Sequence, residues 1–217
     1  MAAKPKIKFD APRVSEDMAL ERVSADRLLT DDWHELLLIE DEEVTLTLER
    51  VIVERVIFRN VTFTDTMLHG IELSDVRFER CDLSNTNWTK AVLHRVSFTD
   101  CRMMGFQLTE ATMRHVSIER CMADYMNMRF SDVKQLLITE TAMNHADMCY
   151  TKLHNTILDQ VELEEAQFSG TSLKGISLKS CSFRGLSIGA EEVRGCLIGR
   201  EQAYVFAHIF GMKIDEA

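Results

Sequence analysis

A bulky apolar side chain returns at every fifth residue along most of this chain. In residues 76–98 (VRFERCDLSNTNWTKAVLHRVSF) the series consists of Phe78, Leu83, Trp88, Leu93 and Phe98. It continues without a break from residue 48 to residue 188, and all 29 of its positions are apolar. An α-helix repeats every ~3.6 residues and a flat strand about every second residue, so neither produces a period of five. The period is therefore an internal structural repeat.

A second column of side chains lies two residues before each bulky residue. It favours small or β-branched residues, such as Val76, Cys81 and Ala91. The three other positions of each unit are largely polar, as Glu79 and Arg80 show. A unit that buries its first and third residues and exposes the others is a very short strand followed by a turn. The pattern predicts a chain that turns a corner every five residues.

The glycines and prolines fit such corners. Six of the nine glycines share one phase, two residues after the bulky position, where a turning backbone needs an unusual φ. These six are Gly70, Gly105, Gly170, Gly175, Gly185 and Gly195. Both prolines, Pro5 and Pro12, precede the repeat, as expected if its backbone N–H groups are needed for hydrogen bonds between coils.

Four such sides would close one coil. Residues twenty apart then stack on successive coils at the inter-strand spacing of about 4.8 Å. The predicted inner ladder consists of Phe58, Phe78 and Phe98. The same core is predicted to hold Phe63, Leu83, Trp88 and Leu93.

The repeat resembles the A(D/N)LXX motif of the pentapeptide-repeat proteins. Close matches are CDLSN at 81–85, ADMCY at 146–150 and TSLKG at 171–175. The resemblance covers residues 46–190 and implies an all-β fold with about seven coils. This fold is a right-handed quadrilateral parallel β-helix, followed here by a short C-terminal α-helix. The right hand is implied by the family and not by the spacing.

A few residues depart from the repeat. Ala123 is small where a large residue belongs, whereas Phe106 and Met126 are large where a small residue belongs. We therefore expect looser or irregular coils near residues 121–131.

Both ends of a solenoid leave sheet edges that pair with other chains unless they are capped. Residues 1–45 lack the repeat and are predicted to form an acidic N-terminal cap, since residues 1–50 carry a net charge of −6. In the stretch DDWHELLLIEDEE, we expect Trp33 and residues 36–39 to cover the first coil. Residues 191–217 are predicted to form a C-terminal cap and dimerisation helix.

The C-terminal stretch GREQAYVFAHIFGMKI predicts a helix over residues 200–210 that stops at Gly211. This helix is apolar on more than one face, so a second surface must cover what the last coil leaves open. Similar members of the pentapeptide-repeat family commonly dimerise through such a helix, which implies a homodimer. The alternative is that the helix only plugs the last coil. The predicted interface consists of Tyr204, Val205, Phe206, Ile209 and Phe210.

Two outer sides of the coil differ in charge. One is predicted to carry a cationic stripe formed by His94, Arg114, Lys134, His154 and Lys174. The neighbouring side is predicted to be an acidic face formed by Asp65, Asp82, Asp124, Glu162, Glu164 and Glu165. The plainer interpretation of the stripe is a solvated surface whose charges pair with neighbouring acids.

Motifs for catalysis are absent from the sequence, which has no GxGxxG, P-loop, GxSxG or HExxH pattern. We therefore expect no enzyme activity, no cofactor, no metal and no small-molecule substrate. Four cysteines recur in the small inward column, where free cysteine serves as a small hydrophobe rather than as a metal or redox ladder. They are Cys81, Cys101, Cys121 and Cys181. The lack of CxxC pairs and of long apolar stretches favours a cytoplasmic protein without membrane contact.

A rod without loops is expected to offer broad flat faces and no pocket, which favours surface recognition. We predict an interaction scaffold for a cytosolic protein partner. Resemblance to the quinolone-resistance members of the family implies an alternative, a DNA mimic that binds DNA gyrase or topoisomerase IV and protects it from fluoroquinolones. A further alternative is weak binding of nucleic acid or another polyanion through the cationic stripe. The net charge of −10 disfavours direct nucleic-acid binding.

Overall fold

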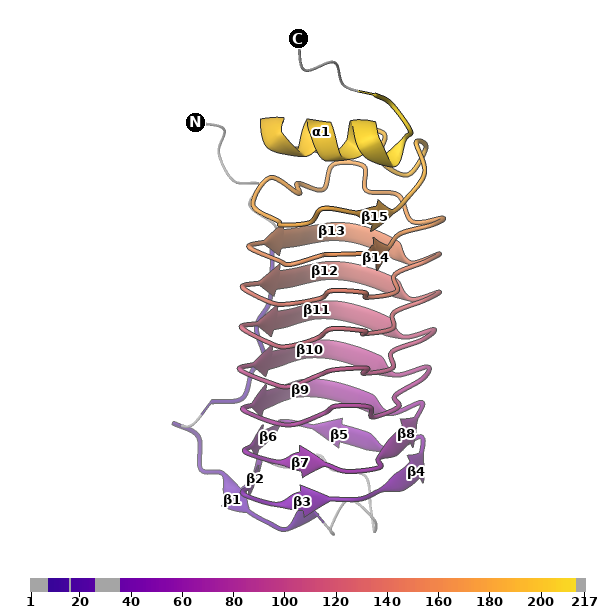
Figure 1. The fold of residues 1–217 in the computed structure, drawn as a ribbon. Helices are drawn as coiled ribbons and strands as arrows, with labels where there is room; N and C mark the ends of the chain where they lie inside the picture. Colours follow the sequence, from indigo (N-terminus) through magenta and orange to yellow (C-terminus); the bar gives the residue numbers. More distant parts are fainter. Residues whose placement is uncertain (1–7, 16, 26–35, 214–217) are drawn as a thin grey trace.

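The chain forms a parallel β-solenoid of about eight turns, closed at one end by a short helix (Figure 1). The computed structural model describes residues 8–15, 17–25 and 36–213. The predicted fold class, a right-handed quadrilateral parallel β-helix with a short C-terminal α-helix, is confirmed.

Five eight-residue strands form the most regular wall of the solenoid. Each strand spans two sides of a coil and bends at the corner between them. They are β9 (Glu72–Glu79), β10 (Val92–Thr99), β11 (Thr112–Glu119), β12 (Asp132–Thr139) and β13 (Lys152–Asp159). The register pairs residues twenty apart, so that Leu93 lies between Leu73 and Met113. The stacking that the period of five predicts is therefore confirmed.

Shorter strands complete the coils at both ends. The earlier ones are β1 (Glu21–Arg22), β2 (Leu37–Glu40), β3 (Glu43–Val44), β4 (Thr47–Glu49), β5 (Ile52–Glu54), β6 (Val56–Arg59), β7 (Thr62–Phe63) and β8 (Met67–His69). The later ones are β14 (Ala166–Gln167) and β15 (Leu186–Ser187). The largest sheet has the order β1-β2-β6-β9-β10-β11-β12-β13, with β5 also paired to β9. Two-stranded ladders join β3 to β7, β4 to β8 and β14 to β15.

The solenoid begins before the repeat becomes visible in the sequence. β2 and β3 pair with the next coil at a spacing of nineteen residues, for example Ile39 opposite Phe58, whereas β4 pairs at a spacing of twenty. The first coil is thus one residue short, which moves its bulky residues out of the later phase. Leu37 and Ile39 are buried in this coil, and Trp33 lies outside the described residues. Strand pairing therefore starts before the boundary that we predicted at residue 46.

Each corner of the coils is a single residue in the left-handed region. Every fifth residue from Arg50 to Gly175 has a φ between 47° and 79°. Most of these residues are not glycine, although a Cβ costs roughly 1 kcal/mol or more in this conformation. The hydrogen bonds and packing of the coil must offset that cost. Among the six glycines that share this phase, all but Gly185 have a positive φ.

The interior is a continuous column of apolar side chains. Phe58, Phe78 and Phe98 stack with ring centroids 4.9 Å apart and interplanar angles of 3° and 9°. This separation matches the spacing of neighbouring strands, about 4.8 Å. Buried around the stacked rings are Phe63, Leu83, Trp88 and Leu93.

The coils near residues 121–131 are regular, contrary to our expectation. Ala123, Met126 and Met128 are fully buried, and the corner geometry continues through this stretch. Met126 adds in the small column the volume that Ala123 lacks in the large one. The two departures offset each other within one coil, because all of these side chains fill the same core.

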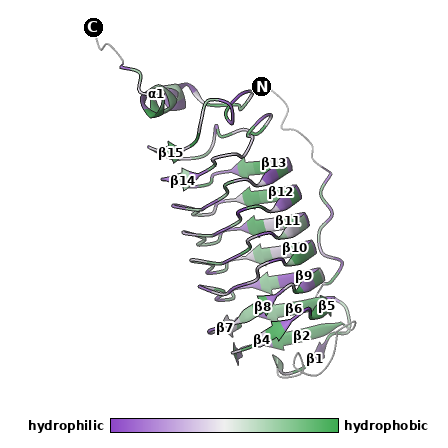
Figure 2. Cartoon of the chain, turned by 90° about the vertical axis from the view of Figure 1, so that its right-hand side faces the viewer, coloured by the Kyte–Doolittle hydropathy of each residue, from purple (hydrophilic) through white to green (hydrophobic). Residues whose placement is uncertain are grey.

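A segment that precedes β1 lies against the outside of the coils. The backbone N–H of Arg13 donates to Oδ1 of Asp75 (2.9 Å), and that of Asp10 donates to Nδ1 of His115 (3.1 Å). Val14, which follows Arg13, is buried. Figure 2 shows this segment rising beside the strands of the main wall.

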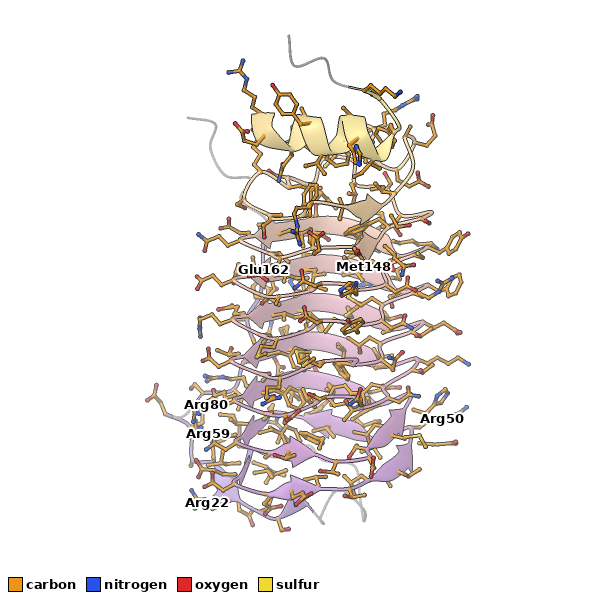
Figure 3. All side chains as sticks on the ribbon, in the orientation of Figure 1. Arg22, Arg50, Arg59, Arg80, Met148 and Glu162 are labelled. Atoms are coloured by element: carbon orange, nitrogen blue, oxygen red, sulfur yellow. The ribbon has the colours of Figure 1, made fainter. Side chains whose placement is uncertain are left out.

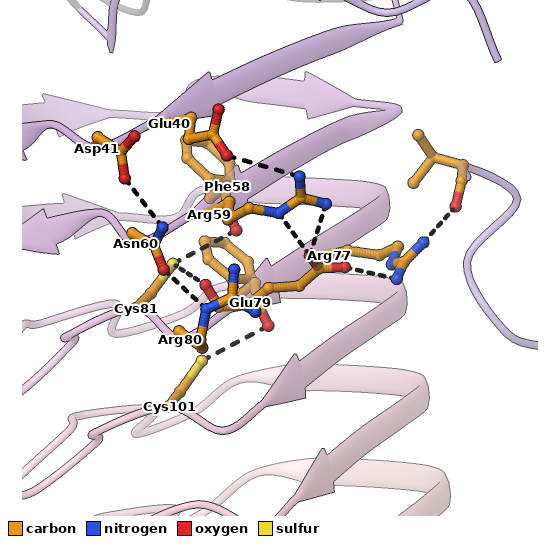
Figure 4. Close-up of polar contacts among 12 residues, drawn as sticks. Glu40, Asp41, Phe58, Arg59, Asn60, Arg77, Glu79, Arg80, Cys81 and Cys101 are labelled. Atoms are coloured by element: carbon orange, nitrogen blue, oxygen red, sulfur yellow. Dashed lines mark hydrogen bonds and ion pairs between the residues drawn. The ribbon is translucent and has the colours of Figure 1, made fainter. Parts of the chain in front are cut away.

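Charged side chains near the first coils form a connected ladder. Arg59 contacts Glu40 (3.6 Å) and Glu79 (2.9 Å), and Arg77 contacts Glu79 (2.5 Å) (Figure 4). Arg77 also donates to the carbonyl group of Val14 (3.5 Å). The ladder therefore joins the outer segment to the coils.

The helix α1 (Arg200–Ile209) lies across the last coil. Its Gln202 donates through Nε2 to the carbonyl groups of Leu178 (2.6 Å) and Cys181 (2.8 Å) and accepts from the backbone N–H of Gly199 (2.8 Å). The side chain of Gln202 thus donates hydrogen bonds to two carbonyl groups at the end of the solenoid, where no further coil follows to bind them. The helix covers a sheet edge that would otherwise be open to pairing.

Candidate interaction surfaces

Three of the four sides of the coil carry features suited to recognition. The acidic side is centred on the inward residues Leu83, Met103, Ala123, Met143 and Leu163. The aromatic side is centred on Trp88, Leu108, Met128, Met148 and Phe168. The basic side is centred on Leu93, Met113, Val133 and Leu153. Figure 3 shows the side chains projecting from the coils in rows along the stack.

The predicted acidic residues lie along one side and the corner that follows it. They are Asp82, Asp124, Glu162 and Glu164 on the acidic side, with Asp65 and Glu165 at the corner. Arginines interrupt the same rows, because Arg102 lies 3.6 Å from Asp82 and Arg184 lies 3.6 Å from Glu164. The negative charge without such partners is thus concentrated in the upper coils.

Some of these acids also hold the coils together. The backbone N–H of Asn144 donates to Oδ1 of Asp124 (2.8 Å), and that of Glu164 donates to Oδ1 of Asn144 (3.0 Å). The N–H of Arg184 donates in turn to Oε2 of Glu164 (2.7 Å). Each side chain in this row therefore binds the backbone of the next coil, which is a structural role that the sequence did not reveal.

A groove lies beneath α1 on the acidic side. Figure 2 shows the helix end-on, displaced from the stack toward the side on which β14 and β15 project. The groove has a volume of about 730 Å³, and its lining includes Asp124, Glu162, Phe183, Arg184, Glu201 and Val205. Our expectation of flat faces without a pocket was wrong. The period of five determines the coil, but it does not determine how the helix is placed across the end of the coil.

The register places most of the predicted cationic stripe in one row. This row contains His94, Arg114, Lys134 and His154, and the exposed Lys174 follows twenty residues later. Arg114 is paired with Asp132 (2.7 Å). Burial, followed by the positive charge of Arg95, lowers the pKa of His94, which keeps this imidazole neutral near pH 7. The row therefore carries less free positive charge than its composition suggests.

Next to this row, Arg95 and Asp75 form a well-shielded ion pair. Nε of Arg95 lies 2.6 Å from Oδ1 of Asp75, and the two side chains are 13% and 11% exposed. Burial tends to raise the pKa of Asp75, but hydrogen bonds from Arg95 and from the backbone of Arg13 lower the pKa overall. The pair fixes the corner between two coils and also receives the outer N-terminal segment.

Two exposed aromatic stacks border the aromatic side. Tyr125 stacks on His145 (4.7 Å, 8°), and Phe130 stacks on Tyr150 (5.3 Å, 7°). The guanidinium carbon of Arg129 lies 5.2 Å from the ring centroid of Phe130. All of these aromatic residues are corner residues with positive φ.

Our sequence analysis missed these stacks. The signal was the phase of Tyr125, Phe130 and Tyr150, which occupy the same position in the repeat as the glycines. An aromatic residue at a position that favours glycine points outward and pays a conformational cost. We instead expected looser or irregular coils near residues 121–131.

The residues of α1 that we assigned to one dimer interface lie on two faces of the helix, one packed on the coil and the other exposed. Phe206 is 7% exposed and faces the coil, so it is not available to a second copy of the chain. This corrects its assignment to a dimer interface. Val205, Ile209 and Phe210 are partly buried against the same core, whereas Tyr204 is 56% exposed. The outward face of the helix is therefore narrower than predicted.

The recurring cysteines are free thiols in the core. Cys81, Cys101, Cys121 and Cys181 are all buried. The thiol of Cys101 donates to the carbonyl group of Phe78 (3.5 Å), and that of Cys81 donates to the carbonyl group of Phe58 (3.4 Å) (Figure 4). Burial raises the pKa of Cys181 to about 11, so its reactive thiolate form is scarce at neutral pH.

Two kinds of feature are absent from the described residues. These residues contain no helix that is both long and apolar enough to cross a membrane. Within the same residues, no group of three or more His, Cys, Asp or Glu side chains is arranged to hold a metal ion.

Known proteins share the repeat. Residues 71–148 match the family model for a pentapeptide repeat region, and residues 146–185 match the model for eight copies of pentapeptide repeats. YisX of Bacillus subtilis is 36% identical over 131 residues, which are 60% of this chain and 61% of YisX. The chain thus matches less than two thirds of that relative.

Two solved structures are also similar, at lower sequence identity. A trypsin-treated form of QnrB1, a plasmid-mediated fluoroquinolone resistance protein, is 17% identical with a TM-score of 0.47, covering 82% of this chain and all of that one. HetL of the cyanobacterium Nostoc, involved in heterocyst differentiation regulation, is 13% identical with a TM-score of 0.39, covering 75% and 83%. The two family models together match residues 71–185, more than half of the sequence. The chain therefore belongs to the pentapeptide-repeat family.

Proposed function

We propose that this protein is a non-enzymatic, cytoplasmic scaffold that binds a protein partner through its aromatic side. The observation that supports this is the exposure of the aromatic stacks, in which Tyr125, Phe130 and Tyr150 are 57%, 53% and 54% exposed. Tyr125 and Phe130 lie at the two corners of the aromatic side in one coil, and Tyr150 lies next to Phe130 in the following coil, so exposed rings border this side at both corners.

The fold alone gives little reason for these residues. A large side chain at a left-handed corner is conformationally costly, and ring stacking returns only about 0.5–1.5 kcal/mol. Glycine or asparagine would fit the same corner without exposing apolar surface. Exposed aromatic side chains are, by contrast, the usual anchors of protein interfaces.

The charges near the stacks favour a protein over a nucleic acid. Arg129, beside Phe130, pairs with Asp147 (2.9 Å). Lys90 and Glu110, which precede Phe130 in its corner column, lie 4.0 Å apart. These charges are therefore largely compensated. A nucleic acid would need uncompensated positive charge on this side.

Site-specific photo-crosslinking in cells tests the proposal. A benzoylphenylalanine in place of Phe130 is expected to give one discrete adduct with another protein. The matched control replaces Glu140, an exposed residue with positive φ at the opposite corner. Absence of an adduct at position 130, or the same adducts at both positions, would contradict the scaffold.

A DNA mimic that binds gyrase or topoisomerase IV is the second candidate. The acidic side supports it, because a mimic must place carboxylates where phosphates are expected. Arg102 and Arg184 interrupt that row and weaken the case. Gyrase supercoiling assays, with and without a fluoroquinolone and at two salt concentrations, test it directly. Inhibition that salt weakens and DNA competes would support the mimic, and no effect at roughly 50 µM protein would remove it.

Binding of nucleic acid or another polyanion through the cationic stripe has less support. Arg114 is paired, the pKa of His94 is lowered, and the outer N-terminal segment lies against His115. Lys134 and Lys174 remain exposed. Too little free positive charge is left for strong binding of phosphates.

We also propose that α1 supports a homodimer, now through its outward face alone. Tyr204 and Leu197 are more than half exposed at this end of the rod. Tyr204→Asp is expected to halve the mass in light scattering while leaving the melting temperature of the coil unchanged. An unchanged mass would exclude this face from self-association.

A further inference from the structure

Among the described residues, the groove beneath α1 gathers carboxylates without a cationic partner, although Asp124 and Glu162 accept hydrogen bonds from Asn144 (2.8 and 3.4 Å). Asp124 and Glu162 lie in its wall, and Glu201 enters from the first turn of the helix. Among the residues that the structure describes, none of these three has a cationic partner within 4.0 Å. Arg184 also lines the groove; its side chain is 89% exposed, and its Nε lies 3.6 Å from Oε2 of Glu164, a further acidic residue of the lining. The groove is thus net negative after its internal pairing.

Several other charged residues of the coil are paired across neighbouring coils. Arg95 pairs with Asp75 (2.6 Å), and Arg120 pairs with Asp100 (2.8 Å). The groove departs from this pattern at the point where the coil meets the helix. A fold that needed these carboxylates only for solubility would not have to gather them in a concave site.

The remaining lining is apolar and aromatic. Phe183 and Val205 contribute apolar surface, and the exposed ring of Tyr125 lies at the rim, stacked on His145. Such a surface fits a side chain with an apolar stem and a cationic head. Arginine and lysine have this form, since their methylene groups cover apolar surface while their heads pair with carboxylates. An aromatic ring beside the groove adds cation–π attraction.

Other ligand classes fit less well. A nucleic acid or another polyanion would be repelled by the three carboxylates. A purely apolar helix would bury those carboxylates without a compensating positive charge, which is costly. The described residues also provide no cluster of ligands suited to a metal ion.

We propose that the groove beneath α1 is the docking site for an arginine- or lysine-bearing segment of a protein partner. Asp124, Glu162 and Glu201 bind the cationic heads, while Phe183 and Val205 contact the stems. The inference deepens the proposed scaffold function and rests on it, because it gives the chemistry of the partner. It places a second contact beside the aromatic stacks, with Tyr125 at the junction of the two.

Fluorescence anisotropy tests the docking site. The probe is a fluorescein-labelled peptide, GLRALRGLKALR, and its control has glutamine at every arginine and lysine. The groove variant combines Asp124→Asn, Glu162→Gln and Glu201→Gln. The charge-matched control combines Glu49→Gln, Glu72→Gln and Glu140→Gln, which are exposed residues outside the groove.

The groove variant should keep its fold. Asn144 already makes through its amide oxygen the contact that Asp124 makes, since it accepts the backbone N–H of the residue twenty positions later. Asp124→Asn therefore preserves this hydrogen bond. Equal melting temperatures of the two triple variants verify that any loss of binding is not unfolding.

We expect the groove variant to bind the basic peptide at least roughly tenfold more weakly than the parent, and the control variant less than about threefold. The glutamine peptide should not bind. Equal losses in both variants, absence of binding to the parent, or displacement of the peptide by spermidine at equal charge would overturn the proposal. The first and last of these results would indicate attraction to net charge alone.

The outcome is separable from that of the scaffold proposal. If the groove variant still gives the adduct at position 130 but the peptide results are negative, the scaffold stands and the groove is not its docking site. If no adduct forms in the parent, the scaffold fails whatever the peptide does.

Discussion

The ring of Phe206 packs edge-on against that of Phe183, with centroids 5.7 Å apart and planes at 70°. This contact joins the C-terminal helix to the last coil. Removing it should expose the sheet edge that Gln202 and the helix cover. Phe206→Ala is expected to cost about 3 kcal/mol of unfolding free energy, as large-to-small changes at buried aromatic residues do.

Chemical denaturation with light scattering checks this prediction. Phe206→Ala should lower stability at every protein concentration, whereas Tyr204→Ala, on the exposed face of the same helix, should change it by less than about 0.5 kcal/mol. A monomeric but fully stable Phe206→Ala variant would show instead that the ring belongs to a dimer interface.

The period of five can be tested at one strand. Leu93 is fully buried, while the preceding residue, Val92, is 39% exposed. Leu93→Asp places an unpaired charge between coils and should abolish cooperative unfolding, whereas Val92→Asp should shift the melting temperature only slightly. Similar melting curves for the two variants would refute the assignment of inward and outward residues.

Two glycines allow the cost of the corners to be measured. Gly175 has a φ of +79°, whereas the φ of Gly185 is outside the left-handed region. At both positions, a Cβ atom would have no described neighbour within 4 Å. Gly175→Ala should therefore lose about 1 kcal/mol through backbone conformation alone. Gly185→Ala should be neutral or slightly stabilising. Equal effects in urea denaturation would mean that the corner φ is not the cause.

The ion pair of Asp75 and Arg95 predicts a specific response to acid. The folded pKa of Asp75 is below its ordinary value of 3.8, so the contribution of the pair is complete above that value and is lost as pH falls through the folded pKa. Asp75→Asn should cost about 2 kcal/mol near pH 7, and the difference from the parent should shrink below about pH 4. A difference that stays constant down to about pH 2 would exclude this carboxylate.

Much of the coil could be predicted from the sequence, because burial in a four-sided solenoid repeats strictly every five residues. The stack of Phe58, Phe78 and Phe98 follows directly from that period. The first coil was missed since one residue fewer separates Ile39 from Phe58, which breaks the phase. Ala123 and Met126 misled us because single positions do not show that volume is conserved within a coil.

The surfaces were less predictable for a physical reason. The positions of Asp124 and Glu164 in the repeat indicate which side they occupy, but not that they bind backbone N–H groups of the next coil. The groove depends on where α1 crosses the last coil, and this is determined by the contacts of Gln202 and Phe206. Contacts that depend on where a helix or side chain lies in space produce no periodic pattern in the sequence, so the sequence alone did not reveal them.

The affinity of the partner captured at position 130 tests the central claim most directly. Biolayer interferometry would compare the parent with a double variant, Phe130→Ser and Tyr150→Ser, and with a control, Glu140→Ser and Gln160→Ser. Aromatic anchors cost about 2 kcal/mol each when removed, so the account predicts a loss of affinity of roughly 1000-fold for the first variant. The control should bind as the parent does. Unchanged affinity in the aromatic variant, with the coil still folded, would contradict recognition through this side.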